Sequence, residues 1–224
     1  MESVWSLVIY FAICSFLGWI IQVCVYLFQL KKIINNGFLY GPFIPLFGFT
    51  ALIIYFFNLY FVNYPLQIRL IFYFILPTVM EYFTGFLLDK IFKVKLWDYS
   101  HQKFNIKGRI SLGISLVWFI LILFHVFVLQ NIIFSLINYF SESVQIVVAV
   151  IFLIYFSIDF FSSTKVFYYF SKLNKNFGKI NIKNINKKFK NKIKSISNKV
   201  KISPVFKRNL SKDFEEFVTK FSKR

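Results

Sequence analysis

The 224-residue sequence is poor in several residue types, and each scarcity excludes a kind of protein. It has only two cysteines, Cys14 and Cys24, which lie in one apolar stretch. On a helix their spacing corresponds to about 15 Å, so they cannot form a disulfide with each other. The two histidines, His101 and His125, show no metal-ligand spacing with the cysteines or with each other, so we predict no metal and no cofactor.

Motifs of nucleotide-driven and hydrolytic enzymes are also missing. The chain has no G-x-x-x-x-G-K-[ST] stretch, so any nucleotide-driven step requires a separate subunit. It has no G-x-S-x-G elbow for a serine nucleophile either. We therefore assign no catalytic residue, and an enzyme is the less favoured interpretation.

Acidic residues are scarce as well, with nine Asp/Glu against 27 Lys/Arg in a chain that is 58% hydrophobic and 22% aromatic. The charge is unevenly distributed, because the last sixty positions alone hold eighteen Lys/Arg and three Asp/Glu. One soluble domain would not combine this hydrophobicity with a net charge of +18. The sequence therefore predicts a transmembrane domain over 1–165 and a basic cytoplasmic tail over 166–224.

Long apolar runs dominate the first of these parts, and several approach the roughly 20 residues that a helix needs to cross a bilayer. They predict an all-α, polytopic helical membrane protein with about five transmembrane helices. The predicted spans are Val4–Leu30, Phe43–Val62, Leu66–Leu88, Ile110–Leu129 and Val144–Thr164. The first run is too long for a secretory signal and lacks basic residues before it, so we expect it to stay in the mature protein.

The orientation of the chain is predicted from the lysines and arginines of its short loops. The first and third loops between the spans carry such residues, whereas the second and fourth carry none. This pattern and the basic tail place the N-terminus outside and the C-terminus in the cytoplasm. We predict a multi-pass membrane protein.

Three polar residues interrupt the predicted spans: Gln22, Glu81 and Asp159. Each lies in the cytoplasmic half of its span, about 6–8 Å from the centre at 1.5 Å per residue. Since polar groups at this depth face a protein interior or a cavity, we expect them, with Tyr82 beside Glu81, to form one substrate pocket. The alternative is that Glu81 is neutral, or paired with Arg109 or a lysine, and only holds helices together.

The third loop is rich in polar residues, over the stretch LWDYSHQKFNIKGRISLG at 96–113. We expect Asp98, Asn105 and Arg109 to fold it into a hydrogen-bonded cap over the cytoplasmic mouth of the pocket, with Arg109 holding a carboxylate. The alternative is an ordinary positive-inside loop whose Trp97 and Tyr99 anchor it at the membrane surface.

The stretch NNGFLYGPFIPLFGF at 35–49, called the lip below, places helix-breaking residues at the cytoplasmic entry to the second span. Irregular backbone at membrane depth is tolerated only where protein or water covers it, so the lip should face inward. Gly37 is expected to take a positive φ, and the glycines to permit close helix packing. The alternative is a packing corner without a ligand. The structural lip residues are Gly37, Gly41, Pro42, Pro45 and Gly48.

Four motifs occur in the order SFLGWIIQV, the lip, PTVMEYFTGFLLDKIF and WDYSHQKFNIKGRISLGISLVW. In this order they resemble the bacterial putative ABC-transporter type IV (CmpB-like) family over roughly residues 3–130. The resemblance implies a permease of the bacterial inner membrane. The family tends to have glutamate at the positions of Gln22 and Asp89 and arginine at that of Asn36. Gln22 cannot titrate, which disfavours proton coupling through the first helix. Glu81, Asp98 and Arg109 match as they stand.

The tail has apolar residues spaced by three or four from Ile182 to Val200, with lysine and asparagine between them. This pattern predicts a basic amphipathic helix on anionic lipid headgroups, followed by a second helix that begins near Pro204. Compositional bias is the open alternative. We predict no nucleic-acid binding, since no recognition fold or aromatic platform accompanies the charge.

These patterns favour a permease-like component that moves a small solute or lipid, with a homodimer or a separate ATPase subunit as partner. Two alternatives remain open: a membrane-embedded enzyme that acts on lipid, with Glu81 or Asp98 as general base, and an assembly or regulatory scaffold.

Overall fold

The computed structural model describes residues 2–31, 35, 37–92 and 94–177, with the backbone alone for residues 29, 30 and 169–177. The chain divides into two units, Met1–Tyr169 and Phe170–Arg224, of which the first is described here. The amphipathic helices predicted for the tail lie outside the described residues, as does Asn36.

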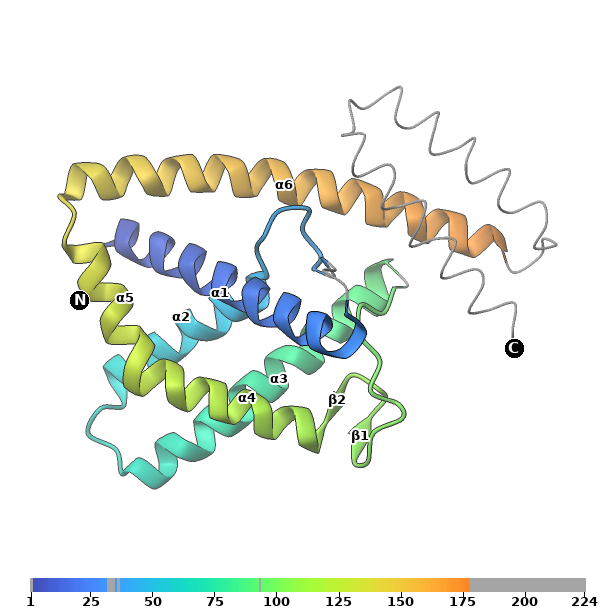
Figure 1. Ribbon diagram of the computed structural model, residues 1–224, viewed down its shortest axis with the longest axis horizontal. Coiled ribbons are helices and arrows are strands. Elements are labelled where there is room, and N and C mark those ends of the chain that lie inside the picture. Colours follow the sequence, from blue (N-terminus) through green and yellow to red (C-terminus); the bar gives the residue numbers. More distant parts are fainter. Residues whose placement is uncertain (1, 32–34, 36, 93, 178–224) are drawn as a thin grey trace. The chain divides into compact units, whose positions relative to one another are not determined.

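The described chain is mostly helical, which confirms the predicted fold class (Figure 1). Its elements are α1 (Val4–Leu30), α2 (Pro45–Tyr60), α3 (Leu66–Phe92), β1 (Asn105–Ile106), β2 (Ile110–Ser111), α4 (Leu112–Phe124), the π-helical turn η1 (His125–Leu129), α5 (Gln130–Asn138) and α6 (Glu142–Phe177). Among the described residues, four helical stretches are long and apolar enough to cross a membrane, and α2 is a shorter apolar helix.

The predicted span boundaries hold best for α1, which has the predicted bounds. The fourth span was predicted to begin at Ile110, but this residue belongs to β2, and the helix starts after the N-cap Ser111, which accepts a hydrogen bond from the N–H of Ile114. The same helix continues to Asn138 instead of ending at Leu129, because η1 joins α4 to α5 without a break. Helix α6 runs through the predicted domain boundary at 165/166 to Phe177.

The π-helical turn lies against α1 through a buried polar contact. The Tyr10 hydroxyl and the Nε2 atom of His125 are 2.5 Å apart, and the ring of Tyr10 stacks on Phe134 of α5. Because a π-turn holds one residue more than an α-turn, it changes the direction in which the following side chains point. Phe134 and Ile137 thus face the core around Tyr10.

The short helix α2 lies at the centre of the helical packing. Ala51 and Tyr55 belong to a buried cluster with α1 and α5, whereas Ile54 belongs to a second cluster with Tyr73 of α3 and Ile122 of α4. Contacts on both sides explain why a helix of 16 residues is an integral part of the fold. Most apolar side chains of α6 are exposed instead, as expected for a helix in contact with lipid.

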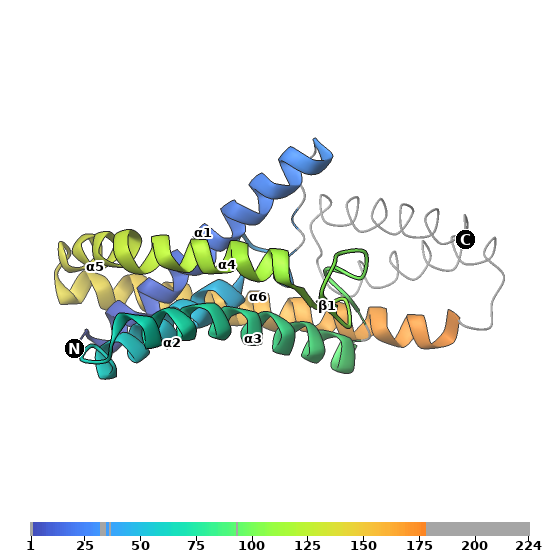
Figure 2. The same cartoon turned by 90° about the horizontal axis from the view of Figure 1, so that it is seen from below.

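The connections of the helices gather at two opposite ends (Figures 1 and 2). The N-terminus, the α2–α3 turn and the α5–α6 turn lie at one end. The lip and the α3–α4 loop (residues 94–111), which contains the β-hairpin, lie at the other, called the hairpin end below. All sequence-predicted site residues belong to the half of the molecule that leads to the hairpin end.

Glycines set the close crossing of α1 and α2. A Cβ atom on Gly18 would collide with the ring of Phe47, and one on Gly48 would collide with the side chains of Ser15 and Phe11. The backbone N–H of Ile44 also donates to the carbonyl oxygen of Ser15 at 2.9 Å. Helix α2 therefore begins pressed against the middle of α1.

Candidate functional site

Glu81 lies inside the helical packing, on α3. Its side chain is 4% exposed. The Oε1 atom accepts a hydrogen bond of 3.1 Å from the hydroxyl of Tyr99, on the α3–α4 loop. The Oε2 atom is buried without a hydrogen-bond partner, and none of the ion pairs of the described residues involves Glu81. A buried carboxylate oxygen without a partner is costly, so this position is the strongest candidate for binding an external group.

Two aromatic side chains, Tyr99 and Trp118, lie beside this carboxyl group, and two more lie beside those rings. The indole of Trp118, on α4, lies beside it, and the ring of Phe47, at the end of the lip, is 4.5 Å from that of Trp118 between centroids. Tyr26, on α1, lies near Tyr99. Burial raises the pKa of Tyr99, which keeps its hydroxyl protonated as the donor to Glu81.

Gln22 lies on the face of α1 that is directed toward this group of rings. Gly18 contacts Phe47 and Tyr26 lies near Tyr99, and residues four apart along a helix share a face. Gln22, four residues from each, is therefore on the same face and is half-buried.

Arg109, predicted to hold a carboxylate, pairs with Asp89 and not with Glu81. Its Nη2 atom donates to Oδ2 of Asp89 at 2.8 Å, and its Nη1 atom donates to the Tyr82 hydroxyl at 3.3 Å. The guanidinium lies 5.4 Å from the ring centroids of both Tyr82 and Phe86. Tyr82 thus belongs to the Arg109 cluster, which ties the α3–α4 loop to α3.

A double-mutant cycle on Arg109→Gln and Asp89→Asn is expected to give a measurable stabilising coupling in the free energy of unfolding, since the two side chains are 13% and 35% exposed. The cycle is measured by chemical unfolding in detergent. The Lys95–Asp98 pair, whose side chains are nearly half exposed, is the matched control and should give a smaller coupling. Equal couplings in the two cycles would contradict the structural role assigned to Arg109.

The α3–α4 loop is held by hydrogen bonds within itself. Asp98 accepts from the backbone N–H of Ser100 at 3.0 Å, and this bond holds the pKa of Asp98 below its usual range. The side chain of Asn105 donates to the carbonyl oxygens of Ser100 and Gln102 and accepts from the N–H of Gly108. Gly108 has a φ of 69°, and a Cβ atom there would collide with Asp98. Asp98 and Asn105 therefore act inside the loop and do not face Glu81.

Asp159, predicted to share the pocket of Glu81, binds the lip instead. Its side chain is 7% exposed. One carboxylate oxygen accepts from the N–H of Tyr40 at 3.0 Å and the other from the N–H of Gly41 at 2.9 Å. The hydroxyl of Ser163, one turn along α6, donates to the same carboxylate at 3.2 Å and accepts from Tyr40. The lip is thus fastened to α6 through its backbone.

The breaker residues of the lip have distinct roles. A Cβ atom on Gly41 would lie 2.8 Å from Oδ2 of Asp159 and would collide with the hydroxyl of Tyr155. Pro42 lies in a tight turn in which the N–H of Phe43 donates to the carbonyl oxygen of Gly41, and Pro45 is the first residue of α2. The positive φ expected for Gly37 is not found there: Lys31, the C-cap of α1, has that conformation and ends the helix.

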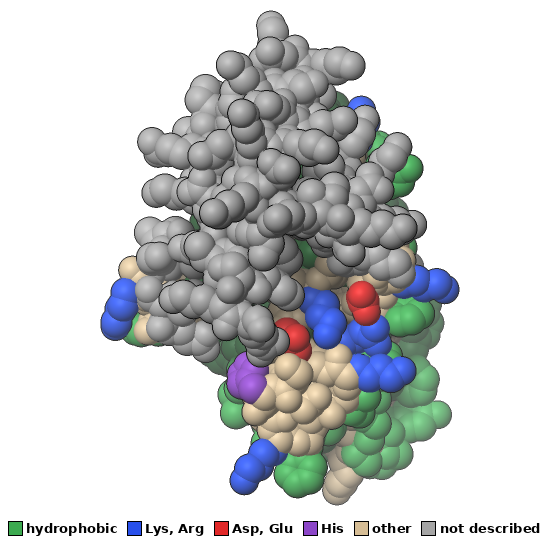
Figure 3. Space-filling view, turned by 90° about the vertical axis from the view of Figure 1, so that its right-hand side faces the viewer, with side chains coloured by type: hydrophobic (Ala, Val, Ile, Leu, Met, Phe, Trp, Pro, Cys, Tyr) green, Lys and Arg blue, Asp and Glu red, His purple; other side chains and the backbone are tan. Residues whose placement is uncertain are grey.

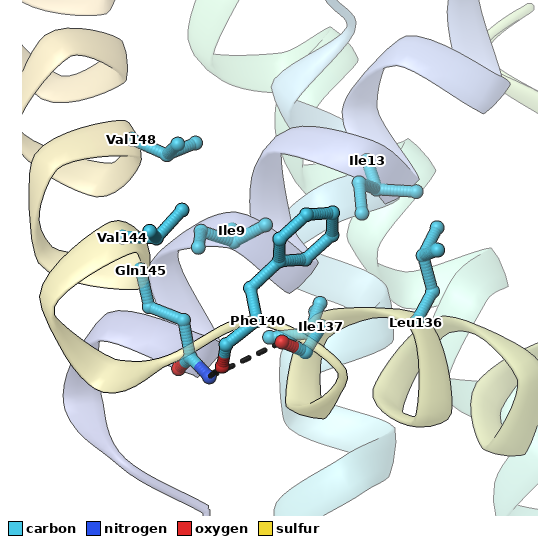
Figure 4. Close-up of a pocket in the computed structure, with 8 residues that line it drawn as sticks. All are labelled: Ile9, Ile13, Leu136, Ile137, Phe140, Val144, Gln145 and Val148. Atoms are coloured by element: carbon cyan, nitrogen blue, oxygen red, sulfur yellow. Dashed lines mark hydrogen bonds between the residues drawn. The ribbon is translucent and has the colours of Figure 1, made fainter.

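At the opposite end, a pocket of about 140 Å³ lies between α1, α5 and α6. Its lining is apolar except for Gln145, whose amide donates to the carbonyl oxygens of Ile137 and Phe140 (Figure 4). The Gln145 side-chain oxygen accepts from the hydroxyl of Ser6 at 2.8 Å. This pocket offers no unpaired polar group to a solute, so it is not the candidate site. Charged side chains gather at the hairpin end instead (Figure 3).

Sequence reasoning missed four residues that contact the predicted site residues Glu81, Arg109 and Asp159. Tyr99 had been interpreted as a membrane anchor and Trp118 was not singled out. Asp89 was noted only as a departure from the family pattern, although it lies eight residues, or about two helical turns, after Glu81. Ser163 could have been found from its i+4 spacing to Asp159.

Comparison with protein families gives a match to the model described as Putative ABC-transporter type IV, over residues 9–164. The match covers more than two thirds of the chain and includes Gln22, Glu81, Arg109 and Asp159. The chain belongs to this family. No curated protein and no solved structure matches it.

Membership of the putative ABC-transporter type IV family agrees with the helices α1, α3, α4–α5 and α6, which are long and apolar enough to cross a membrane. Together they indicate a membrane protein whose natural surrounding is a lipid bilayer, and the family name suggests the ABC-transporter type. The family match extends beyond the roughly 3–130 of the sequence resemblance and reaches α6, including the carboxylate that binds the lip.

Proposed function

We propose that the chain is a permease-type component that moves a small solute through a site at Glu81. This site opens to the cytoplasm. The observation that carries the proposal is the buried Glu81 carboxyl group, of which one oxygen has no partner while the other is held by Tyr99. A group this costly inside a membrane span is expected where it binds something that the resting protein lacks.

The α3–α4 loop is the gate in this proposal. Because Tyr99 belongs to that loop, a displacement of the loop breaks the hydrogen bond from Tyr99 to Glu81 and uncovers the carboxyl group. The lysines around the loop support a gate on the cytoplasmic side of the inner membrane, with the N-terminus outside.

The remaining parts of a transporter come from partners. Five helices enclose a narrow path at most, so a second copy of the chain is expected to widen it. An ATPase subunit is the energy source that the family name implies. The basic tail is proposed to lie on anionic lipid headgroups.

The test is flux in proteoliposomes with Glu81→Gln, which keeps the shape of the side chain and removes its charge. Solutes from a fractionated metabolite extract that accumulate in the lumen are identified by mass spectrometry. Flux of the accumulated solute should fall about tenfold or more, as expected for loss of a charged binding group, whereas the melting temperature should not fall.

The exposed Glu142, at the start of α6, provides the control, and Glu142→Gln should keep the flux of the unmodified protein. Tyr99→Phe should give an intermediate loss. Unchanged flux in Glu81→Gln would refute the proposal and favour a scaffold in which Glu81 only holds helices together. Turnover of labelled lipid without flux would favour the enzyme.

A further inference from the structure

We infer that the solute bound at Glu81 is a monovalent organic cation, recognised by the carboxylate and by the surrounding aromatic rings. The inference rests on the proposed function and specifies its substrate class. Its first support is the charge balance around Glu81.

The cations of the described residues near this site are engaged elsewhere. Arg109, which approaches α3 one turn beyond Glu81 at Gly85, forms its ion pair with Asp89. Lys95 forms its ion pair with Asp98, in the loop. Arg69 donates to Tyr73, near the start of α3. An ionised Glu81 therefore has no countercharge among the described residues, and a bound anion would add to the repulsion.

The surroundings of the carboxyl group select among cations. The side chains of Trp118 and Tyr99 lie beside the carboxyl group, and Phe47 lies beside Trp118. The faces of such rings attract cations through their negative quadrupole. A metal ion would require several oxygen ligands, and the described residues hold no group of three metal-ligating side chains. One carboxylate among rings is suited to an alkylammonium group, whose charge is spread over a partly apolar surface.

Access to the site requires the loop to move. The side chain of Glu81 is 4% exposed and Tyr99 covers one of its oxygens, so a ligand reaches the carboxylate only after the loop has been displaced. The ligand then takes the place that the Tyr99 hydroxyl holds in the closed form. Cation binding and loop opening are therefore coupled.

The experiment uses the full chain in detergent and in proteoliposomes, with tetramethylammonium as the probe because its charge is permanent. A neutral analogue built on a quaternary carbon, neopentyl alcohol, and the anion acetate are the controls. We expect saturable binding of tetramethylammonium by calorimetry, at least about tenfold weaker in Glu81→Gln and in Trp118→Leu. Trp118→Phe, which keeps a ring, should lose less, and Glu142→Gln should bind as the unmodified chain does.

The outcomes separate this inference from the proposed function. Binding of tetramethylammonium without uptake upholds the cation site and refutes transport. Glu81-dependent uptake of a neutral or anionic solute upholds transport and refutes the cation site. Equal binding of the neutral counterpart, undiminished binding in Glu81→Gln, or no binding of tetramethylammonium up to millimolar concentration also overturns the inference. Circular dichroism and melting curves of each variant show whether it is folded.

Discussion

Asp159→Ala is expected to cause one of the largest losses of stability that a single substitution produces in this protein. The change removes the carboxylate that accepts from the N–H groups of Tyr40 and Gly41, although the Tyr40 N–H keeps the Ser163 hydroxyl. A buried polar group without a partner costs about 1–3 kcal/mol, so the free energy of unfolding should fall by roughly 2–4 kcal/mol. Unfolding in detergent, followed by circular dichroism, measures this loss.

The release of the lip can be measured separately from global stability. A cysteine introduced at Tyr40 in a Cys24→Ser background should react faster with a thiol reagent when Asp159 is replaced, since the exposed Cys24 is removed and Cys14 is buried. Ser163→Ala should have a smaller effect, because the carboxylate keeps both backbone bonds. Glu142→Gln, an exposed change on the same helix, is the control. If Asp159→Ala unfolds no more readily than this control, the fastening of the lip to α6 is wrong.

Gly48→Ala should weaken the crossing of α1 and α2 by roughly 1–3 kcal/mol, the usual cost of excess volume in a packed core. The added methyl group would overlap Phe11 and Ser15, and Ser15 is fully buried. The effect should increase with side-chain size from alanine to valine. Thermal unfolding of the purified variants in detergent tests this series.

Gly113→Ala, in the first turn of α4, is the matched control, because the added Cβ atom would lie 4.0 Å from its nearest neighbour, Oε1 of Gln102. Alanine is favoured over glycine in a helix, by up to about 1 kcal/mol, so this variant should be as stable as the unmodified chain or more so. Similar melting temperatures for Gly48→Ala and Gly113→Ala would contradict a crossing set by close contact at Gly48.

The parts of the fold that the sequence predicts well are those governed by neighbouring residues. The long apolar runs fix α1 and α3, and the loop residues Asp98, Asn105 and Gly108 lie within eleven positions, so their bonds form locally. The fourth span was predicted too short because Gln130 and Asn131 resemble a helix end. Their helix continues because residues beyond them pack on Tyr10 and Tyr55.

The contacts between distant segments could not be derived in the same way. A carboxylate in a span was expected to meet other side chains, but Asp159 binds backbone N–H groups more than a hundred residues away. Arg109 had two carboxylates within reach on α3, and apolar periodicity does not distinguish Asp89 from Glu81. The choice depends on how the loop folds back on α3, which places the guanidinium between Tyr82 and Phe86.

The π-helical turn at His125–Leu129 holds one residue more than a regular α-helical turn. Each residue of an α-helix advances the azimuth by about 100°, so the same residues wound as regular α-helix, without the wider turn, would rotate everything after them by roughly that angle. The side chains that now pack on Tyr10 would swing toward the lipid, while the helix itself would remain unbroken. The extra residue in the turn thus determines which side of the second half of the helix faces the protein interior.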